Sequence, residues 1–137
     1  MANLYSQFTY DAALSLKAAG LVAASADGTI LDLGEGLVDS YLVLDVSAVE
    51  TATGDEIYTI SLEGSTVAAM TSTSVCLAKK VMGNIVVPMD GVTATGRFVV
   101  PFRNEENGTL YRYVRLSTLV AGTIATGINF MAFIAKE

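Results

Sequence analysis

The amino-acid sequence predicts an all-β fold, a jelly-roll-like β sandwich in one domain with an extended N-terminal arm. Short segments rich in Val, Ile, Thr, Tyr and Phe recur about every 8 to 15 residues, and these side chains suit a pleated, half-buried surface. Gly-containing turns separate the segments, and no internal repeat is visible. At 137 residues one core suffices, so we expect the arm over residues 1–10 and the sandwich over residues 11–137.

The composition predicts a protein that associates with other subunits. Hydrophobic residues make up 52% of the chain and charged residues 16%, and the mean hydropathy is +0.50. This is more apolar than a free-standing soluble monomer usually is, so we expect an oligomer or a partner interface. The net charge of −6 argues against a nucleic-acid partner, because phosphate chains are bound mainly by clustered Lys and Arg.

The first ten residues are interpreted as an extended arm that carries Tyr5, Phe8 and Tyr10 among polar residues. Such an arm is either a frayed terminus or a segment ordered against a neighbouring subunit through its aromatic rings. It has neither a basic region nor a continuous apolar core of a secretory signal, so we expect synthesis in the cytoplasm.

Residues 11–26 are Ala-rich, and a strand is favoured there over a helix because Gly20 interrupts the helical spacing. The dipeptide Asp27-Gly28 predicts a two-residue hairpin that joins Leu21-Val22 to residues 29–31. Residues 41–46 and 57–62 alternate with period two, so each predicts a strand with one wetter face. Leu42, Leu44 and Val46 form the drier face of the first; Tyr41, Val43 and Asp45 form the other.

The remaining segments are predicted as follows. Residues 53–56 are a turn, and residues 64–78 are a loop or weak strand. Residues 98–102 and 110–116 bracket a polar loop with Asn107-Gly108, which predicts a hairpin. Pro101 removes a ladder donor and predicts an edge strand or a bulge.

The uncharged run from Leu116 to Ala135 raises the question of a membrane helix. A span needs about 20 predominantly apolar residues, whereas this run contains seven Ser, Thr, Gly or Asn residues. Buried strands are therefore preferred over a membrane anchor or a buried helix, with turns or bulges at Ala121-Gly122 and Thr126-Gly127.

The residue inventory excludes several kinds of site. The chain has no His, so Ser-His-Asp, Cys-His and His-based metal sites are excluded. Asp55-Glu56 and Glu105-Glu106 are interpreted as solvated turn charges, and the single Cys76 as a small buried hydrophobe. We therefore expect no enzyme, no cofactor, no metal and no small-molecule substrate.

Two sets of charged residues, one acidic and one of arginines, each have two possible roles. The acidic residues are either calcium ligands or a solvated, turn-rich edge, and their spacing does not fit an EF-hand. They are Asp27, Asp32, Glu35 and Asp39. All four arginines fall within nineteen residues: Arg97, Arg103, Arg112 and Arg115. They either pair across strands with Glu105 and Glu106 or present a surface to an acidic partner.

Four segments carry a resemblance to a known family. They are YDAALSL (10–16), ILDLG (30–34), YRYVRLS (111–117) and VAGTIATGINFMAFI (120–134). In order and content they resemble the small capsid cement, or decoration, proteins of tailed phages, of the Bordetella-podophage type. Residues 64–89 depart from the resemblance.

The resemblance implies a jelly-roll-like sandwich that assembles as a homotrimer and binds the major capsid protein on the outer surface of the virion at local threefold positions. It implies no catalytic residues. Under this hypothesis Phe130, Phe133 and Ile134, or the Met131 side, divide between the core and the trimer axis. Tyr5, Phe8 and Tyr10 would reach the shell or a neighbouring subunit, and Arg112 and Arg115 are candidate contacts.

Two alternatives stay open beside a cement protein. A non-catalytic jelly-roll module of a tail fibre or receptor-binding structure would share the composition, although the absence of Trp is unusual for a sugar-binding surface. The other alternative is a membrane protein anchored through the uncharged run from Leu116 to Ala135.

Overall fold

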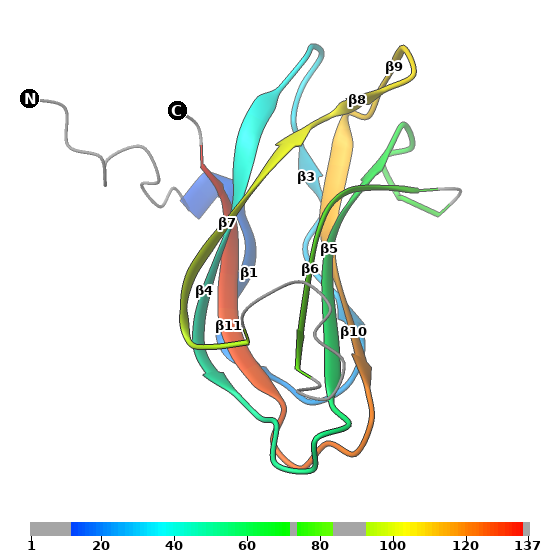
Figure 1. Ribbon diagram of the computed structural model, residues 1–137. Helices are drawn as coiled ribbons and strands as arrows, with labels where there is room; N and C mark the ends of the chain where they lie inside the picture. The colour runs from blue at the N-terminus through cyan, green and yellow to red at the C-terminus, as the bar shows by residue number, and fades with distance from the viewer. Residues whose placement is uncertain (1–11, 72–73, 84–92, 136–137) are drawn as a thin grey trace, which may run out of the picture.

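A computed structural model describes residues 12–71, 74–83 and 93–135, which form two antiparallel β-sheets packed face to face (Figure 1). Sheet one has the order β1 (Ser15–Val22), β11 (Ile128–Ala135), β4 (Asp39–Val49), β7 (Gly96–Arg103). Sheet two has the order β2 (Ala26–Asp27), β10 (Tyr113–Ala121), β5 (Ile57–Ser65), β6 (Val75–Gly83), and β3 (Leu31–Asp32) also pairs with β10. Outside the sheets lie the 3₁₀ helix η2 (Ala12–Leu14) and a small ribbon of β8 (Glu105–Glu106) and β9 (Thr109–Leu110).

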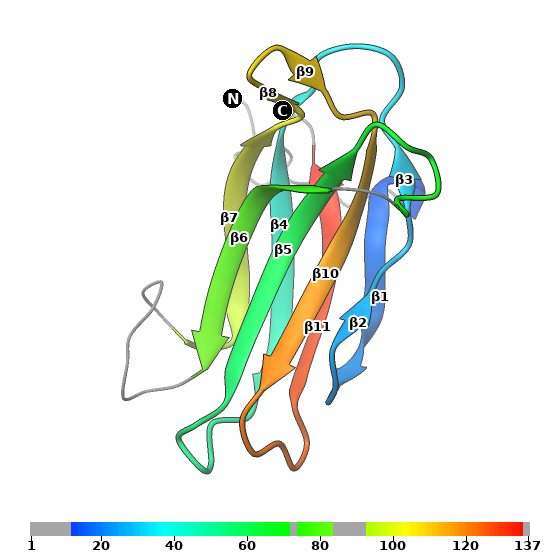
Figure 2. The same ribbon diagram turned by 90° about the vertical axis from the view of Figure 1, so that its right-hand side faces the viewer.

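The strand pairing is that of a jelly roll. The first strand pairs with the last, β2 and β3 with β10, β4 with β7, and β5 with β6, so the chain forms four nested antiparallel pairs. Pairs β11–β4 and β10–β5 then join them into two sheets. Figure 2 shows sheet two in front, with sheet one behind it. The predicted all-β, jelly-roll-like sandwich is confirmed.

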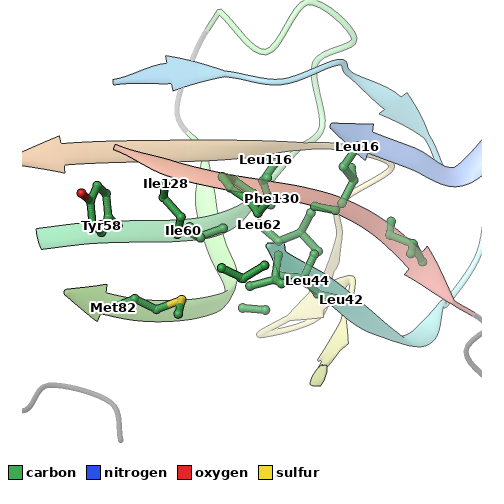
Figure 3. Packing of buried hydrophobic residues seen from close by; sticks show 14 of the residues in the cluster. Leu16, Leu42, Leu44, Tyr58, Ile60, Leu62, Met82, Leu116, Ile128 and Phe130 are labelled. Carbon is green, nitrogen blue, oxygen red and sulfur yellow. The ribbon is translucent and has the colours of Figure 1, made fainter. Parts of the chain in front are cut away.

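The core between the sheets follows from period-two alternation. Leu42, Leu44 and Val46 of β4 point inward, and β5 contributes alternate residues from Tyr58 to Leu62, as predicted. Phe130 of β11 lies among them (Figure 3). Burying a side chain of this kind contributes about 1.5–3 kcal/mol relative to leaving it in water.

The uncharged run from Leu116 onward forms the end of β10 and the whole of β11, so the prediction of strands is confirmed. Gly122 and Gly127 lie in the connection between these strands. Both have positive φ, at 94° and 98°, as expected of the predicted turns.

The predicted strand in residues 11–26 is confirmed as β1, but the hairpin at Asp27-Gly28 is wrong. The chain crosses here from sheet one to sheet two: β1 pairs with β11, whereas Asp27 pairs with Ser117 of β10. Gly28 follows the crossing and lies between β2 and β3, which both pair with β10; an added Cβ there would stand 2.6 Å from the carbonyl oxygen of Leu16 in sheet one. A glycine is needed here because the backbone of residue 28 passes close to that of Leu16, not because the chain makes a tight turn.

The predicted hairpin over residues 98–116 is also wrong in its strands, although its tip is right. Asn107 and Gly108 have positive φ and turn the small β8–β9 ribbon. The flanking strands β7 and β10 lie in opposite sheets and do not pair. The buried side chain of Asn104 fixes this connection by accepting from the amide of Val38 at 2.7 Å and donating to two carbonyl oxygens, of Gly36 and Tyr111.

Residues 64–78 were predicted as a loop or weak strand; residues 66–71 form such a loop, but both ends of the range belong to regular strands. β5 continues to Ser65, and β6 begins at Val75. Cys76 was expected to be buried but is exposed, because it faces Glu63 at a register shift between β5 and β6.

The open edges of both sheets are guarded against pairing with further strands. Pro101 lies on β7, the last strand of sheet one, which confirms the predicted edge position. Lys17 of β1 points inward, with its ammonium 4.5 Å from the Phe130 ring centroid, and donates to the carbonyl oxygen of Phe130 at 2.7 Å. Lys80 of β6 lies over Phe98 at 4.9 Å. Inward charges and proline are common protections of edge strands.

Candidate functional site

The outer face of sheet one, which points away from the core, is apolar. Three of its side chains are almost fully buried: Val43, Phe133 and Ala135. Tyr41, Val99 and Met131 pack against them and stay partly exposed. We call these six residues the apolar outer face. Because Val43 is 0% exposed, the prediction that its side of β4 is the wetter one is wrong for this residue.

Two ion pairs lie at the two ends of the β4–β7 pair on this face. Arg97 contacts both carboxylate oxygens of Asp45, at 2.7 and 2.9 Å. Arg103 contacts both oxygens of Asp39, at 2.8 and 3.0 Å, and holds the pKa of that carboxyl below its usual value. Each pair stands directly opposite in the β4–β7 register, which aligns the planar guanidinium with the carboxylate. The Arg97 guanidinium also lies 5.5 Å from the centre of the Phe133 ring.

A shallow groove of about 330 Å³ extends the apolar outer face toward β1. It is lined by Ala19, Met131 and Asn129, among others, next to Ser47, where β4 carries an extra residue relative to β11. A bulge of this kind bends the strand and opens the face locally.

The outer face of sheet two is polar by contrast. Ser61 and Ser117 stand opposite each other across β5 and β10, and Arg115 stands opposite Glu63. Leu119 is a large exposed apolar side chain on this face, at 57%. The two outer faces of the sandwich therefore differ in chemistry, and only that of sheet one offers a packed apolar cluster among the described residues.

The structure separates the residues that the sequence grouped as an interface. Phe130 lies in the core, whereas Met131 and Phe133 lie on the apolar outer face. Arg112 directly precedes β10 of the other sheet, and Arg115 lies within that strand. The remaining candidates, Tyr5, Phe8 and Tyr10, lie outside the described residues and stay predictions, as does the arm over residues 1–10.

The four arginines pair with acidic residues of this chain. Arg112 contacts Asp32 through two bonds of 2.7 and 2.9 Å, which keep the pKa of Asp32 low, and it reaches Glu35 at 3.4 Å. Arg115 lies 3.7 Å from Asp27 and 3.9 Å from Glu63.

Cross-strand pairing is thus the arrangement found, but the expected partners Glu105 and Glu106 were wrong for the ion pairs described. The partners are the acidic residues that were weighed as calcium ligands, and Asp45 and Glu63 in addition. Within the described ranges, no group of three or more His, Cys, Asp or Glu residues is placed to hold a metal ion.

At the end of the sandwich opposite the β8–β9 ribbon, three carboxylates accept hydrogen bonds from loop residues. The sequence analysis did not predict this role. Glu50 accepts from the amides of residues 125–127 at 2.8–3.0 Å. Asp55 accepts from the amide and hydroxyl of Thr123. Glu56 accepts from the hydroxyl and amide of Thr53 and from the amide of Gly54.

These hydrogen bonds lower the pKa of all three carboxyl groups. Hydrogen bonds from Gly127 and its neighbours lower the pKa of Glu50; the Thr123 and Thr53 bonds do so for Asp55 and Glu56. Burial raises the pKa of Tyr58 to about 12, with the charges of Glu50 and Glu56 adding to the effect. The sequence pattern that could have predicted this network is the presence of carboxylates next to Gly and Thr residues in turns.

We expect this loop network to make the protein sensitive to acid. Each folded-state pKa lies below its ordinary value of 4.5 for Glu or 3.8 for Asp. Ionisation therefore stabilises the fold fully above about pH 4.5, and the contribution is lost as the pH falls through the depressed folded-state values. Urea unfolding at a series of pH values should show this loss, and Glu50→Gln should lower stability at neutral pH and flatten the acid limb. Glu106→Gln on the exposed β8–β9 ribbon is the control, and an equal slope in all three proteins would contradict the prediction.

Searches against protein-family models and against curated protein sequences gave no match. Within the described ranges, no helix has the length and hydrophobicity needed to cross a bilayer.

Proposed function

We propose that this chain is a non-enzymatic structural protein of a tailed phage, a homotrimeric cement protein that binds the outer surface of the capsid at local threefold sites. The observation that carries the proposal is the asymmetry of the sandwich. One outer face partly exposes Tyr41, Val99 and Met131 over a buried apolar layer and has its flanking charges paired with each other, whereas the other outer face is polar. This is the expected surface chemistry of a subunit that docks on other proteins.

The jelly-roll topology supports the same proposal, because it is the fold that the sequence resemblance implies. Fold alone does not define function, since many unrelated functions share this architecture. The apolar composition adds weight, because 52% hydrophobic residues exceed what one core of this size usually requires.

The proposed mechanism is multivalent clamping. A filled shell contains like-charged DNA under pressure, and a trimer that touches several capsid subunits opposes their separation. Each contact raises the effective concentration of the next, so avidity exceeds single-site affinity by about 10²–10⁴-fold without a strong individual bond.

The arginines contribute to this proposal less than the sequence suggested. Arg112 and Arg115 face acidic residues of their own chain, so the positive charge of this region is largely compensated. We expect that replacing both with Gln leaves binding to capsid shells unchanged across ionic strengths. A loss of binding that is strongest at low salt would instead assign them to an acidic partner surface.

The proposal is tested by measuring the native mass without detergent and then the binding to shells. We expect a species of roughly 43 kDa, three times the 14.3 kDa of one chain. Expanded shells incubated with it should gain the protein at threefold sites and resist heating longer than bare shells. A monomer at every concentration, with no binding to shells, would overturn the proposal and favour the tail-fibre module, which a glycan array would then test.

A further inference from the structure

We infer that the end of the sandwich that carries the β8–β9 ribbon is the surface that contacts the capsid, and that it fits an apolar pocket rimmed by Lys and Arg side chains. We call this surface the ribbon end; it comprises residues 32–39, 66–67 and 103–112. Figure 1 shows the ribbon and the connection from β3 to β4 at this same end. The inference rests on the proposed function and adds to it the contact surface and the chemistry of the partner.

Two large apolar side chains are exposed on neighbouring segments of the ribbon end. Leu37, between β3 and β4, is 55% exposed, and Leu110 of β9 is 43% exposed. The buried Asn104 ties the two segments together. Its side chain accepts from the amide of the residue after Leu37, and it donates to the carbonyl oxygens of the residue before Leu37 and the residue after Leu110. Apolar side chains on segments that are fixed before binding lose less freedom when a partner covers them.

Exposed apolar side chains are concentrated at this end of the sandwich. Val67 is a third, and it follows β5, whose last residue, Ser65, stands opposite Tyr113 at the start of β10. Three of the six large apolar side chains that the described residues expose therefore lie at the ribbon end. In the connections at the opposite end, residues 50–56 and 122–127, none is a large exposed apolar side chain.

The charge of the ribbon end indicates the chemistry of the partner. It contains five Asp or Glu residues and two Arg residues, a balance of −3, which is half of the net charge of the chain. Asp32 and Asp39 hold the two arginines in bidentate pairs. Glu35 and Glu106 stay exposed, and Glu35 reaches an arginine only at 3.4 Å. A partner that surrounds an apolar pocket with Lys and Arg would complement this surface.

The ribbon end is small, so a single copy is expected to bind weakly, as small interfaces usually do. The proposed trimer carries three ribbon ends, and simultaneous binding raises the overall affinity by about 10²–10⁴-fold. A substitution in the chain is present in all three contacts. A modest weakening of each contact therefore gives a large loss of binding to the shell.

The decisive experiment removes the exposed leucines one at a time. Leu37→Ser and Leu110→Ser alter the ribbon end, and Leu119→Ser, at a side chain that is 57% exposed on the outer face of sheet two, is the matched control. We expect each ribbon-end variant to bind expanded shells at least about tenfold more weakly than the parent protein, with the same native mass, and the control to bind as the parent does. Parent-like binding by both ribbon-end variants would overturn the inference and leave the proposed function standing. A parent protein that binds no shells would overturn the proposed function and this inference with it.

The charge of the partner is tested separately. The double variant Glu35→Gln and Glu106→Gln should bind shells more slowly than the parent protein at low salt, and the difference should vanish at high salt. An equal rate for the two proteins at every ionic strength would overturn the assignment of a basic rim to the partner.

Protection of a thiol covers the case in which a serine variant fails to fold. In a Cys76→Ser background, Thr109→Cys on β9 should label with a maleimide at least about tenfold more slowly on shells than free in solution, because a contact excludes water. Ala121→Cys, at the far end of β10, is the control; both positions are exposed. Equal labelling of Thr109→Cys on shells and in solution would overturn the inference.

Discussion

Replacing Gly127 with alanine is expected to lower the free energy of unfolding by about 3–5 kcal/mol, the range of severe backbone and packing disruptions. Gly127 combines a φ of 98° with the closest backbone approach of its kind in the described part of the chain. A Cβ at this position would stand 2.1 Å from the carbonyl oxygen of Val22, so the β1 and β11 ends must separate to admit it. Urea unfolding measures the loss.

The matched control is Gly34→Ala. Gly34 has a similar φ of 83°, but nothing lies within 4 Å of its added Cβ. Only the backbone strain is then felt, at about 1–2 kcal/mol. Equal losses for the two variants would show that strain alone acts at Gly127 and would contradict the steric argument.

Replacing Asn104 with aspartate is expected to cost about 3 kcal/mol, because a buried charge is then left facing two acceptors. The Asn104 amide nitrogen donates at 3.1 Å to the carbonyl oxygen of Gly36 and at 3.2 Å to that of Tyr111. A carboxylate has the same shape but repels both oxygens. The bond that the side chain accepts from Val38 survives, so the loss isolates the two donated bonds.

The pH dependence separates this mechanism from a general disturbance. The aspartate is charged at neutral pH, and protonation at low pH restores a donor, so the difference in stability from the parent protein should shrink as the pH falls. Asn107→Asp on the β8–β9 turn adds the same charge at the surface and should be nearly neutral, since Asp tolerates positive φ. A pH-independent loss at Asn104 would contradict the argument.

The strands were predictable wherever one face is buried and the other is not. In β5, Tyr58, Ile60 and Leu62 alternate with half-buried residues, and the period-two pattern is directly visible. The two hairpins failed for a common reason. A turn signal such as Asp27-Gly28 or Asn107-Gly108 reports local backbone geometry, but the strands that were expected to pair across it, β1 with β3 and β7 with β10, lie in opposite sheets. Local chemistry does not encode that choice, because it depends on which distant strand is available for pairing.

The candidate site was less predictable for the same physical reason. Arg103 pairs with Asp39 and Arg112 with Asp32, and each partner lies more than sixty positions away. Val43 was assigned to a wetter face because one side of a two-layer sandwich is usually solvated, and nothing local marks its burial. Cys76 was judged from residue type alone, whereas its exposure follows from the register shift beside Glu63.

The pairing of the first strand with the last has a consequence for how the molecule is made. Ser15 pairs with Phe133, so sheet one is incomplete until more than a hundred further residues have been synthesised. At about 5–20 residues per second, β1 waits on the order of 10 s for its partner. During that time β1 and β4 have no strand between them, because β11 occupies the place that joins them. The apolar outer face, whose residues come from β4, β7 and β11, is therefore completed only when the last strand has joined the sheet.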